Sequence, residues 1–268
     1  MVHHTCTFDQ LDAKHRYLST GFVASHMYSH IVQNTTYEPK SIINSIEERF
    51  RYRISYQKVY SAKRKVLEHR WGTYEASYHN LPRLLHTIVQ MNPGSYYDTK
   101  TYPYQQKSGK HVLQRSFLAL GAYIQAFKHC RPVLCIDVTF LTGKYKGTIL
   151  TAVAADSNNQ LLPLAIAFVE GENGDSWHWF LERLKNMVVE EVQNVCVIHD
   201  RHKGILQAIS DIKDGSQECH RVALWPDVKS RWCTRHMKAN FHNQFKNRKL
   251  SKLFERLCEQ TQQRKFEM

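Results

Sequence analysis

The sequence predicts an α/β protein in which a small helical region precedes a mixed β-sheet. Apolar residues recur at helical spacing as far as about residue 91, and the Asn92-Pro93-Gly94-Ser95 turn signal then breaks the chain. Beyond this break, β-branched apolar runs alternate with amphipathic segments. We therefore expect a helical domain over residues 19–92 and a sheet domain over residues 93–268. The hydrophobic content of 42% is sufficient for a packed core.

The helical region is predicted to contain two helices joined by a short turn, followed by a third helix. The first helix starts near Pro39, and its apolar side chains repeat at helical spacing through Phe50. The second runs from Ser55 to Gly72, and the third is expected over residues 74–89. The second helix carries the basic residues Lys58, Lys63, Arg64, Lys65 and Arg70. A solvated surface is the default interpretation of such a face, and contact with a DNA backbone is the alternative.

The sheet region opens with three expected strands. Residues 133–140 are β-branched and apolar, which indicates a buried strand. Residues 148–155 and 161–170 flank the turn signal Asp156-Ser157-Asn158-Asn159, so they are expected to pair as an antiparallel hairpin. The apolar segment 117–127 fits either a strand or a helix, because its periodicity does not separate the two.

A helix is expected after the hairpin, with Asp175-Ser176 as its N-cap and apolar residues at helical spacing through Met187. A strand over residues 195–198 and a helix over residues 202–212 come next. With a fifth strand the order becomes β-β-β-α-β-α-β, which is the ribonuclease-H-like arrangement. In this arrangement the first strand is central and the fourth lies beside it.

Charge and composition narrow the class of protein. The formal charge of +13 and the pI of about 9.4 favour a polyanionic partner, and nucleic acid is the usual polyanion for a soluble protein; a merely soluble basic protein is the alternative. No apolar stretch approaches the roughly 20 residues of a membrane helix, and no signal peptide is evident. The seven cysteines are scattered and do not resemble a secreted disulfide framework. We expect a cytosolic or nuclear protein without membrane contact.

Two aspartates, Asp137 and Asp200, each follow an apolar run that is expected to be a strand. If the strands are neighbours, the carboxylates repel unless a cation lies between them. Hard oxygen ligands favour Mg²⁺ or Mn²⁺, and paired metals stabilise the attacking and leaving oxygens of a phosphodiester displacement. For either aspartate alone, a helix cap or an ion pair is the simpler interpretation. Together they predict a metal-dependent nuclease site.

Several motifs around these aspartates resemble the catalytic domain of Mutator-like DNA transposases, a family abundant in plants. The motifs are Asp137-Val138-Thr139-Phe140-Leu141, Gly143-Lys144-Tyr145-Lys146-Gly147, Val169-Glu170-Gly171-Glu172-Asn173, Asp175-Ser176-Trp177 and Asp200-Arg201-His202-Lys203-Gly204. The sequence departs from the family at Val138, where Gly is usual, and at His199, where Ser is usual. The resemblance implies a ribonuclease-H-like core that cuts and joins DNA with Asp137 and Asp200 as metal ligands.

The resemblance also implies a third acid, normally Glu, on a later helix. Glu255, Glu259 and Glu267 are available, and Glu267 is the best placed by comparison with the family. Because Glu267 lies one residue before Met268, we expect a copy that is truncated at one or both ends, with weakened or lost activity. The resemblance also implies a plant origin.

Two cysteine-histidine pairs raise the question of zinc. Cys233 and His236 match the family's Cys-x-x-His motif, but no familiar second pair completes a tetrahedral site, so we expect packing, hydrogen bonding or DNA contact there instead. His4 and Cys6 resemble the end of a WRKY- or GCM-type zinc finger, so residues 1–18 are interpreted as its remnant. Two ligands cannot hold structural zinc, so zinc is expected only if the other half of the finger is present.

Basic residues near the acids and on an expected amphipathic helix over residues 238–252 complete the predicted DNA surface. The expected DNA-binding residues are Lys144, Lys146, Arg201, Lys203, Lys238, Lys246, Arg248 and Lys249. The sequence thus predicts a nuclear transposase that acts on terminal inverted repeats and target DNA, with homo-oligomerisation left open. The alternative is a domesticated, non-catalytic DNA-binding regulator derived from such a transposase, and a ribonuclease or exonuclease on the same fold is a third reading.

Overall fold

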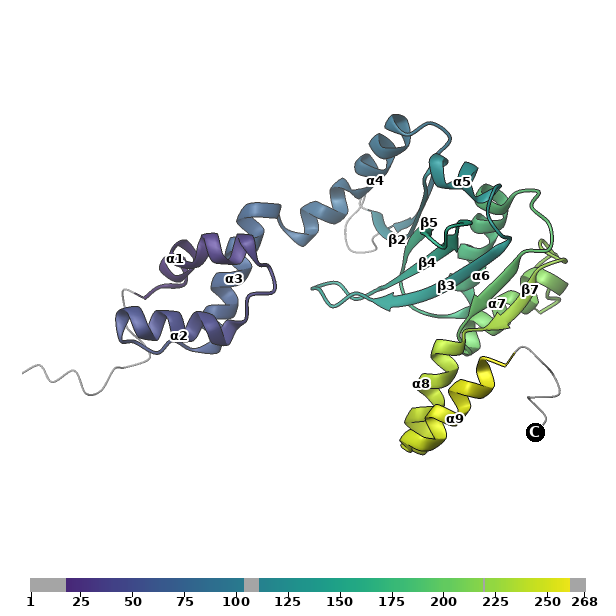
Figure 1. The fold of residues 1–268 in the computed structure, drawn as a ribbon. Helices are drawn as coiled ribbons and strands as arrows, with labels where there is room; N and C mark the ends of the chain where they lie inside the picture. Colours follow the sequence, from purple (N-terminus) through teal and green to yellow (C-terminus); the bar gives the residue numbers. More distant parts are fainter. Residues whose placement is uncertain (1–17, 104–110, 219, 261–268) are drawn as a thin grey trace, which may run out of the picture. The chain divides into compact units, whose positions relative to one another are not determined.

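The computed structural model describes residues 18–103, 111–218 and 220–260, which belong to two compact units (Figure 1). The units divide between Asn80 and Leu81. The domain boundary expected at residues 92 and 93 stays a prediction. The remnant finger with His4 and Cys6 lies outside the described residues.

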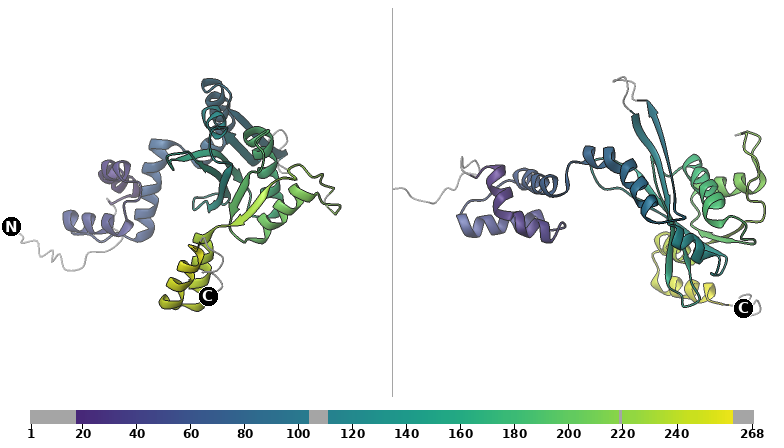
Figure 2. Two further views of the ribbon diagram at one scale, coloured as in Figure 1. Left: turned by 45° about the vertical axis from the view of Figure 1, so that its right-hand side comes forward. Right: turned by 90° about the horizontal axis from the view of Figure 1, so that it is seen from above.

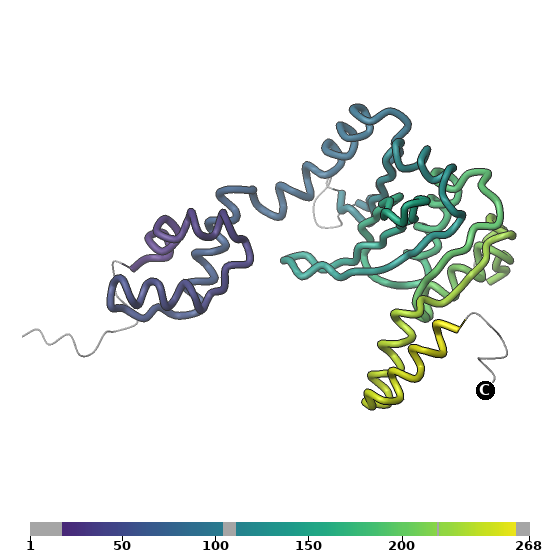
Figure 3. The backbone as a smooth tube through the Cα atoms, viewed as in Figure 1, coloured from purple at the N-terminus to yellow at the C-terminus, as the bar shows by residue number. Residues whose placement is uncertain are grey.

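The first unit contains three helices (Figure 3), and they share one apolar core. The helices are α1 (Thr20–Gln33), α2 (Pro39–Phe50) and α3 (Tyr56–Trp71). Ser19 and Ser55 cap α1 and α3 by accepting hydrogen bonds from backbone N–H groups three residues ahead. The helices predicted from Pro39 to Phe50 and from Ser55 to Gly72 are therefore confirmed. The division between the units falls within a fourth helix, α4 (Tyr74–Met91), which extends two residues past the predicted end.

The second unit contains a seven-stranded mixed sheet among its described residues. In spatial order its strands are β1 (Tyr96–Pro103), β2 (His111–Ala119), β5 (Leu161–Val169), β4 (Thr148–Ala155), β3 (Val133–Phe140), β6 (Cys196–His199) and β7 (Lys229–Trp232). Strands β3, β4 and β5 pair antiparallel, whereas β6 and β7 run parallel to β3. The sequence predicted an α/β protein with a mixed sheet, and this is confirmed. The β1–β2 hairpin was not predicted.

Helices α6 (Gly174–Leu184) and α7 (Lys203–Asp214) lie together against one face of the sheet (Figure 2). A π-helical turn, η1 (Lys185–Val189), extends α6. Leu134 and Ile136 of β3 point into the resulting core, while Cys135 on the other face of the same strand is exposed. One face of the central strand is thus covered, and its other face carries Asp137.

Three local predictions were wrong or incomplete. The segment 117–127 is neither one strand nor one helix, because β2 ends at Ala119 and α5 (Gly121–Phe127) begins after Leu120. The N-cap of α6 is Asn173 rather than Asp175-Ser176, since the Asn173 side chain accepts from the Ser176 N–H group at 2.9 Å.

The expected single helix over residues 238–252 is instead a helical hairpin of α8 (Thr234–Phe245) and α9 (Arg248–Cys258). The chain turns at Lys246, which adopts a left-handed backbone conformation and ends α8. Among the helices described, none is long and apolar enough to cross a membrane.

Candidate functional site

Asp137 lies in the last half of β3, on the face of the sheet that α6 and α7 leave uncovered. Its side chain is half-buried, and its Oδ1 atom accepts the N–H group of Val138 at 2.9 Å. The neighbouring strand β4 supplies Thr151, whose hydroxyl donates to the Asp137 carbonyl oxygen at 3.3 Å. The β-branched Val138 is accommodated in regular strand geometry.

Asp200 follows the last residue of β6 and precedes α7. Its Oδ1 atom accepts the N–H group of His202 at 3.1 Å, which shapes the turn into the helix. His199, the residue before it, is fully buried, and its Nε2 atom lies 2.7 Å from the Ser230 hydroxyl of β7 while Nδ1 contacts the Asp200 carbonyl oxygen. Burial lowers the pKa of His199, which favours the neutral ring.

The sheet places the strand that carries Asp137 beside the strand that leads to Asp200. Parallel pairing matches Val133 with Cys196 and Cys135 with Ile198, where the ladder ends; the same register continued by two residues would set Asp137 opposite Asp200. Neighbouring strands are about 4.8 Å apart, and residues in the same register share a face of the sheet. The predicted adjacency of the two strands is therefore confirmed, and the metal role of the two carboxylates stays a prediction.

Arg235, in the first turn of α8, reaches across to Asp137. Its Nη2 atom donates to Asp137 Oδ2 at 2.8 Å. His236 lies beside the pair, with its Nε2 atom 3.2 Å from Arg235 Nη2 and 3.8 Å from Asp137 Oδ1. The sequence marked this region only through the Cys233 and His236 motif, and nothing in that spacing indicated that Arg235 contacts Asp137.

The turn before α6 supports the turn that carries Asp200. Glu172 Oε1 lies 3.2 Å from His202 Nδ1 and 3.4 Å from the indole nitrogen of Trp177, which donates to it. Gly204 packs directly against the Asn173 backbone. Glu172 and Asn173 thus help to position Asp200 indirectly, through His202 and Gly204.

A third acid is not brought to this pair within the described ranges. Glu255 and Glu259 both accept from Lys238, at 2.9 Å and 3.3 Å, and Glu267 lies outside the described residues. No group of three or more His, Cys, Asp or Glu side chains suited to a metal occurs in the part of the chain that the structure describes. The zinc role considered for Cys233 and His236 therefore gains no support, and the identity of the third acid stays open.

The expected DNA-binding residues lie in three places. Arg201 and Lys203 are exposed beside Asp200, and the Arg201 guanidinium lies 5.5 Å from the Trp232 ring centroid. Lys144 and Lys146 belong to the loop after β3. The remaining residues lie on the α8–α9 hairpin, where Lys246, Arg248 and Lys249 are exposed at its tip and Lys238 is engaged by two glutamates.

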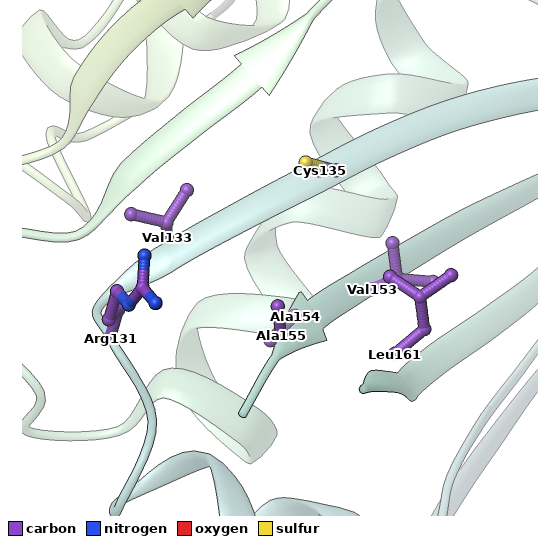
Figure 4. Close-up of a pocket in the computed structure, with 7 residues that line it drawn as sticks. All are labelled: Arg131, Val133, Cys135, Val153, Ala154, Ala155 and Leu161. Atoms are coloured by element: carbon purple, nitrogen blue, oxygen red, sulfur yellow. The ribbon is translucent and has the colours of Figure 1, made fainter. Parts of the chain in front are cut away.

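A separate cavity of about 150 Å³ opens beside the start of β3 (Figure 4). Its lining comes from β3, β4, β5 and the preceding loop and consists of Arg131, Val133, Cys135, Val153, Ala154, Ala155 and Leu161. The lining has no carboxylate or imidazole, so the cavity is unsuited to the chemistry considered at Asp137.

Comparison with known families identifies the region around these aspartates. Residues 133–240 match the family model of the MULE transposase domain. This chain carries a MULE transposase domain. The search of curated proteins found no match. The MULE transposase domain runs from β3 into α8 and so includes Asp137, Asp200, Cys233 and His236. The predicted resemblance to Mutator-like transposases is confirmed, and a transposase domain implies interaction with DNA.

Proposed function

We propose that this chain acts as a Mutator-like transposase in which Asp137 and Asp200 hold Mg²⁺ or Mn²⁺ for cleavage and strand transfer at element ends. The observation that carries the proposal is the parallel pairing of β3 with β6, since the same register continued by two residues would set the two carboxylates opposite each other. The strand order β5-β4-β3-β6-β7, with three antiparallel strands followed by two parallel ones, supports a ribonuclease-H-like core.

The donor set suits a hard divalent cation. Two carboxylates are enough for Mg²⁺, which usually keeps several waters and takes further ligands from substrate phosphates. When bound, the ion would activate the attacking oxygen and stabilise the leaving oxygen of the phosphodiester. The chain's own residues would hold and orient the ion through Asp137 and Asp200, while Arg201 and Lys203 would bind the DNA backbone beside it.

The direct test is nicking of DNA that carries terminal inverted repeats, with Mn²⁺ or Mg²⁺ present. Asp137→Asn and Asp200→Asn should each reduce cleavage at least about a hundredfold if they hold the ion. Asp214→Asn is the matched control, because it removes the same charge from an exposed position at the end of α7. Equal cleavage by wild type and Asp137→Asn would remove the catalytic assignment.

The second candidate is a non-catalytic DNA-binding regulator derived from a transposase. Two observations favour it. Arg235 is hydrogen-bonded to Asp137, and among the described residues no third acid joins Asp137 and Asp200 in a metal-binding group. Site-specific DNA binding without cleavage, unchanged in Asp200→Asn, would select this candidate. In either case the substrate implies a nuclear location, while truncation and homo-oligomerisation stay predictions.

For the first unit we propose a supporting contact with DNA through α3. Tyr60, Arg64 and Trp71 are exposed on one stripe of this helix, and residues 51–71 contain seven Lys or Arg against one Glu. Exposed aromatic and cationic side chains together fit stacking and phosphate binding. Lys63 is an exception to the predicted basic face, since it donates to the Tyr37 carbonyl oxygen at 2.8 Å and burial lowers its pKa.

Binding of a labelled duplex at several salt concentrations tests the α3 contact. Arg64→Gln with Lys65→Gln should weaken binding and lower the salt dependence by about two counterions. Lys40→Gln with Arg49→Gln removes two exposed charges from α2 and is the control. Equal losses in the two double variants would show that only net charge matters, which would argue against a specific role for α3.

A further inference from the structure

Arg235 is a cationic partner of Asp137. In the structure both oxygens of Asp137 accept a hydrogen bond, Oδ1 from the Val138 N–H group at 2.9 Å and Oδ2 from Arg235 Nη2 at 2.8 Å. A divalent ion that binds Asp137 through Oδ2 must therefore take the place of the guanidinium or share the oxygen with it. An ion and an arginine at one carboxylate oxygen also repel each other.

The backbone of Arg235 is anchored, whereas its side chain is largely exposed. The Cys233 N–H group donates to the His199 carbonyl oxygen at 2.7 Å, which ties the start of α8 to the end of β6. The Arg235 side chain itself is 72% exposed, and its contacts are with Asp137 and His236 rather than with the core. The guanidinium can therefore leave the carboxylate without disturbing the sheet.

We infer that Arg235 neutralises Asp137 when no divalent ion is bound and that metal binding displaces it. This inference rests on the proposed function, because it requires Asp137 to be a metal ligand. The exchange replaces one positive charge with two at the same oxygen. The released guanidinium stays tethered beside the site, where its planar donors suit the phosphate oxygens of DNA.

The exchange couples the two ligands of the site. Phosphate that binds Arg235 withdraws it from Asp137 and so raises the affinity of Asp137 for the ion. Linkage requires the reciprocal effect, in which the ion raises the affinity of the chain for DNA by the same factor. Arg235 would thus favour metal binding in the presence of substrate.

Titration of Mn²⁺ into the full chain without DNA, followed by calorimetry or electron paramagnetic resonance, tests the exchange. Arg235→Gln should bind Mn²⁺ roughly two- to fivefold more tightly than wild type, a modest factor because the ion pair is exposed. Arg231→Gln is the matched control, since it removes an exposed arginine of β7 that donates to the Ser230 carbonyl oxygen at 2.8 Å. An affinity for Mn²⁺ in Arg235→Gln equal to that of wild type or of Arg231→Gln would overturn the inference.

Asp137→Asn separates this inference from the proposed function. Loss of Mn²⁺ binding in Asp137→Asn together with unchanged affinity in Arg235→Gln would refute the exchange alone. If Asp137→Asn keeps wild-type Mn²⁺ binding, the metal site itself is refuted and the exchange falls with it.

DNA affinity measured in a chelator gives a second, metal-free readout. When Asp137 is intact, Arg235→Gln should change the affinity for a labelled duplex little, because the guanidinium is already hydrogen-bonded to Asp137. In the Asp137→Asn background the same change should weaken DNA binding at least about threefold, since the arginine is then free for phosphate. Equal factors in the two backgrounds would mean that Asp137 does not restrain Arg235.

Discussion

Gly204, in the first turn of α7, lies directly against the backbone of Asn173, at the turn that leads into α6. A Cβ atom at residue 204 would lie 2.9 Å from the carbonyl carbon of Asn173 and 3.1 Å from the nitrogen of Gly174. Both neighbours are backbone atoms, so they cannot move aside as the end of a flexible side chain would. The contact therefore fixes the turn that carries Asp200 against the turn before α6.

Gly204→Ala should destabilise the second unit by about 1–2 kcal/mol. Overpacking costs about 1–3 kcal/mol, and the better helix propensity of alanine offsets at most about 1 kcal/mol. Denaturant unfolding followed by circular dichroism measures the difference. Gly174→Ala is the control, because a Cβ there would lie 3.8 Å from the Gly204 carbonyl oxygen, an ordinary contact. Equal stability of the two variants would show that the Gly204 contact is not tight.

The strands around Asp137 could be predicted residue by residue because two local signals agree there. A β-branched apolar run defines β3, and the turn chemistry at Asp156 fixes both strands of the next hairpin, where Asp156 Oδ1 accepts from the N–H groups of Asn158 and Gln160 at 2.8 Å each. Strand β1, at the edge of the sheet, was missed because its sequence is largely polar, and of β2 only the apolar end within the segment 117–127 was noticed. A strand of this kind at the edge of a sheet has no apolar run to reveal it.

Interactions between distant segments were harder to predict. The neighbourhood of Asp137 and Asp200 follows from strand order and register, so it was accessible to a topological argument. The Arg235 contact depends on how far one side chain reaches from a helix beyond β7, and no local pattern encodes that reach. The α8–α9 hairpin was mistaken for one helix because its amphipathic periodicity continues through Lys246, where neither Gly nor Pro marks the turn.

The Glu170 carboxylate should be a major electrostatic contributor to the stability of the second unit. Its partner Arg115 is buried, donates through Nε to Glu170 Oε2 at 2.9 Å and also donates to the Asp175 carbonyl oxygen at 3.0 Å. Glu170→Gln leaves this buried guanidinium without its counter-charge, so we expect a loss of roughly 1–3 kcal/mol. The loss stays below that of a fully buried pair because the Glu170 side chain is 39% exposed.

Glu190→Gln provides the comparison for Glu170. Glu190 pairs with Lys128 at 3.1 Å, but both side chains are exposed, so its loss should stay below about 0.5 kcal/mol. Acid titration adds a second check on Glu170. Burial raises its pKa, but hydrogen bonding and charge from Arg115 outweigh this and hold the pKa below 4.5. Its contribution is therefore present above pH 4.5 and is lost as the pH falls through the lowered value.

The second unit should lose stability as the pH falls below about 6.5, in part through His178 of α6. Burial lowers the pKa of this imidazole, and the positive charge of Arg221 lowers it further. The folded state therefore favours the neutral ring, so its contribution is complete above 6.5 and is lost as the pH falls through the lowered pKa. Thermal unfolding between pH 5 and 8 should show a shallower pH dependence for His178→Gln. His129→Gln removes an exposed ring of the same unit, and equal flattening in both variants would contradict a specific role for His178.

Lys246→Gly should stabilise the α8–α9 hairpin by about 0.5–1 kcal/mol. Lys246 ends α8 at a φ of 48°, where a side chain costs about 1–2 kcal/mol of conformational strain. Glycine removes this strain, but its greater freedom in the unfolded chain offsets part of the stabilisation. Asn247→Ala should act in the opposite direction, because the Asn247 side chain caps α9 by accepting from the N–H groups of Lys249 and Leu250. No residue of α8 or α9 is fully buried in the described structure, so amide hydrogen exchange within these helices is the suitable measurement. Slower exchange in Lys246→Gly and faster exchange in Asn247→Ala are expected, and equal rates in wild type and Lys246→Gly would mean that the turn carries no backbone strain.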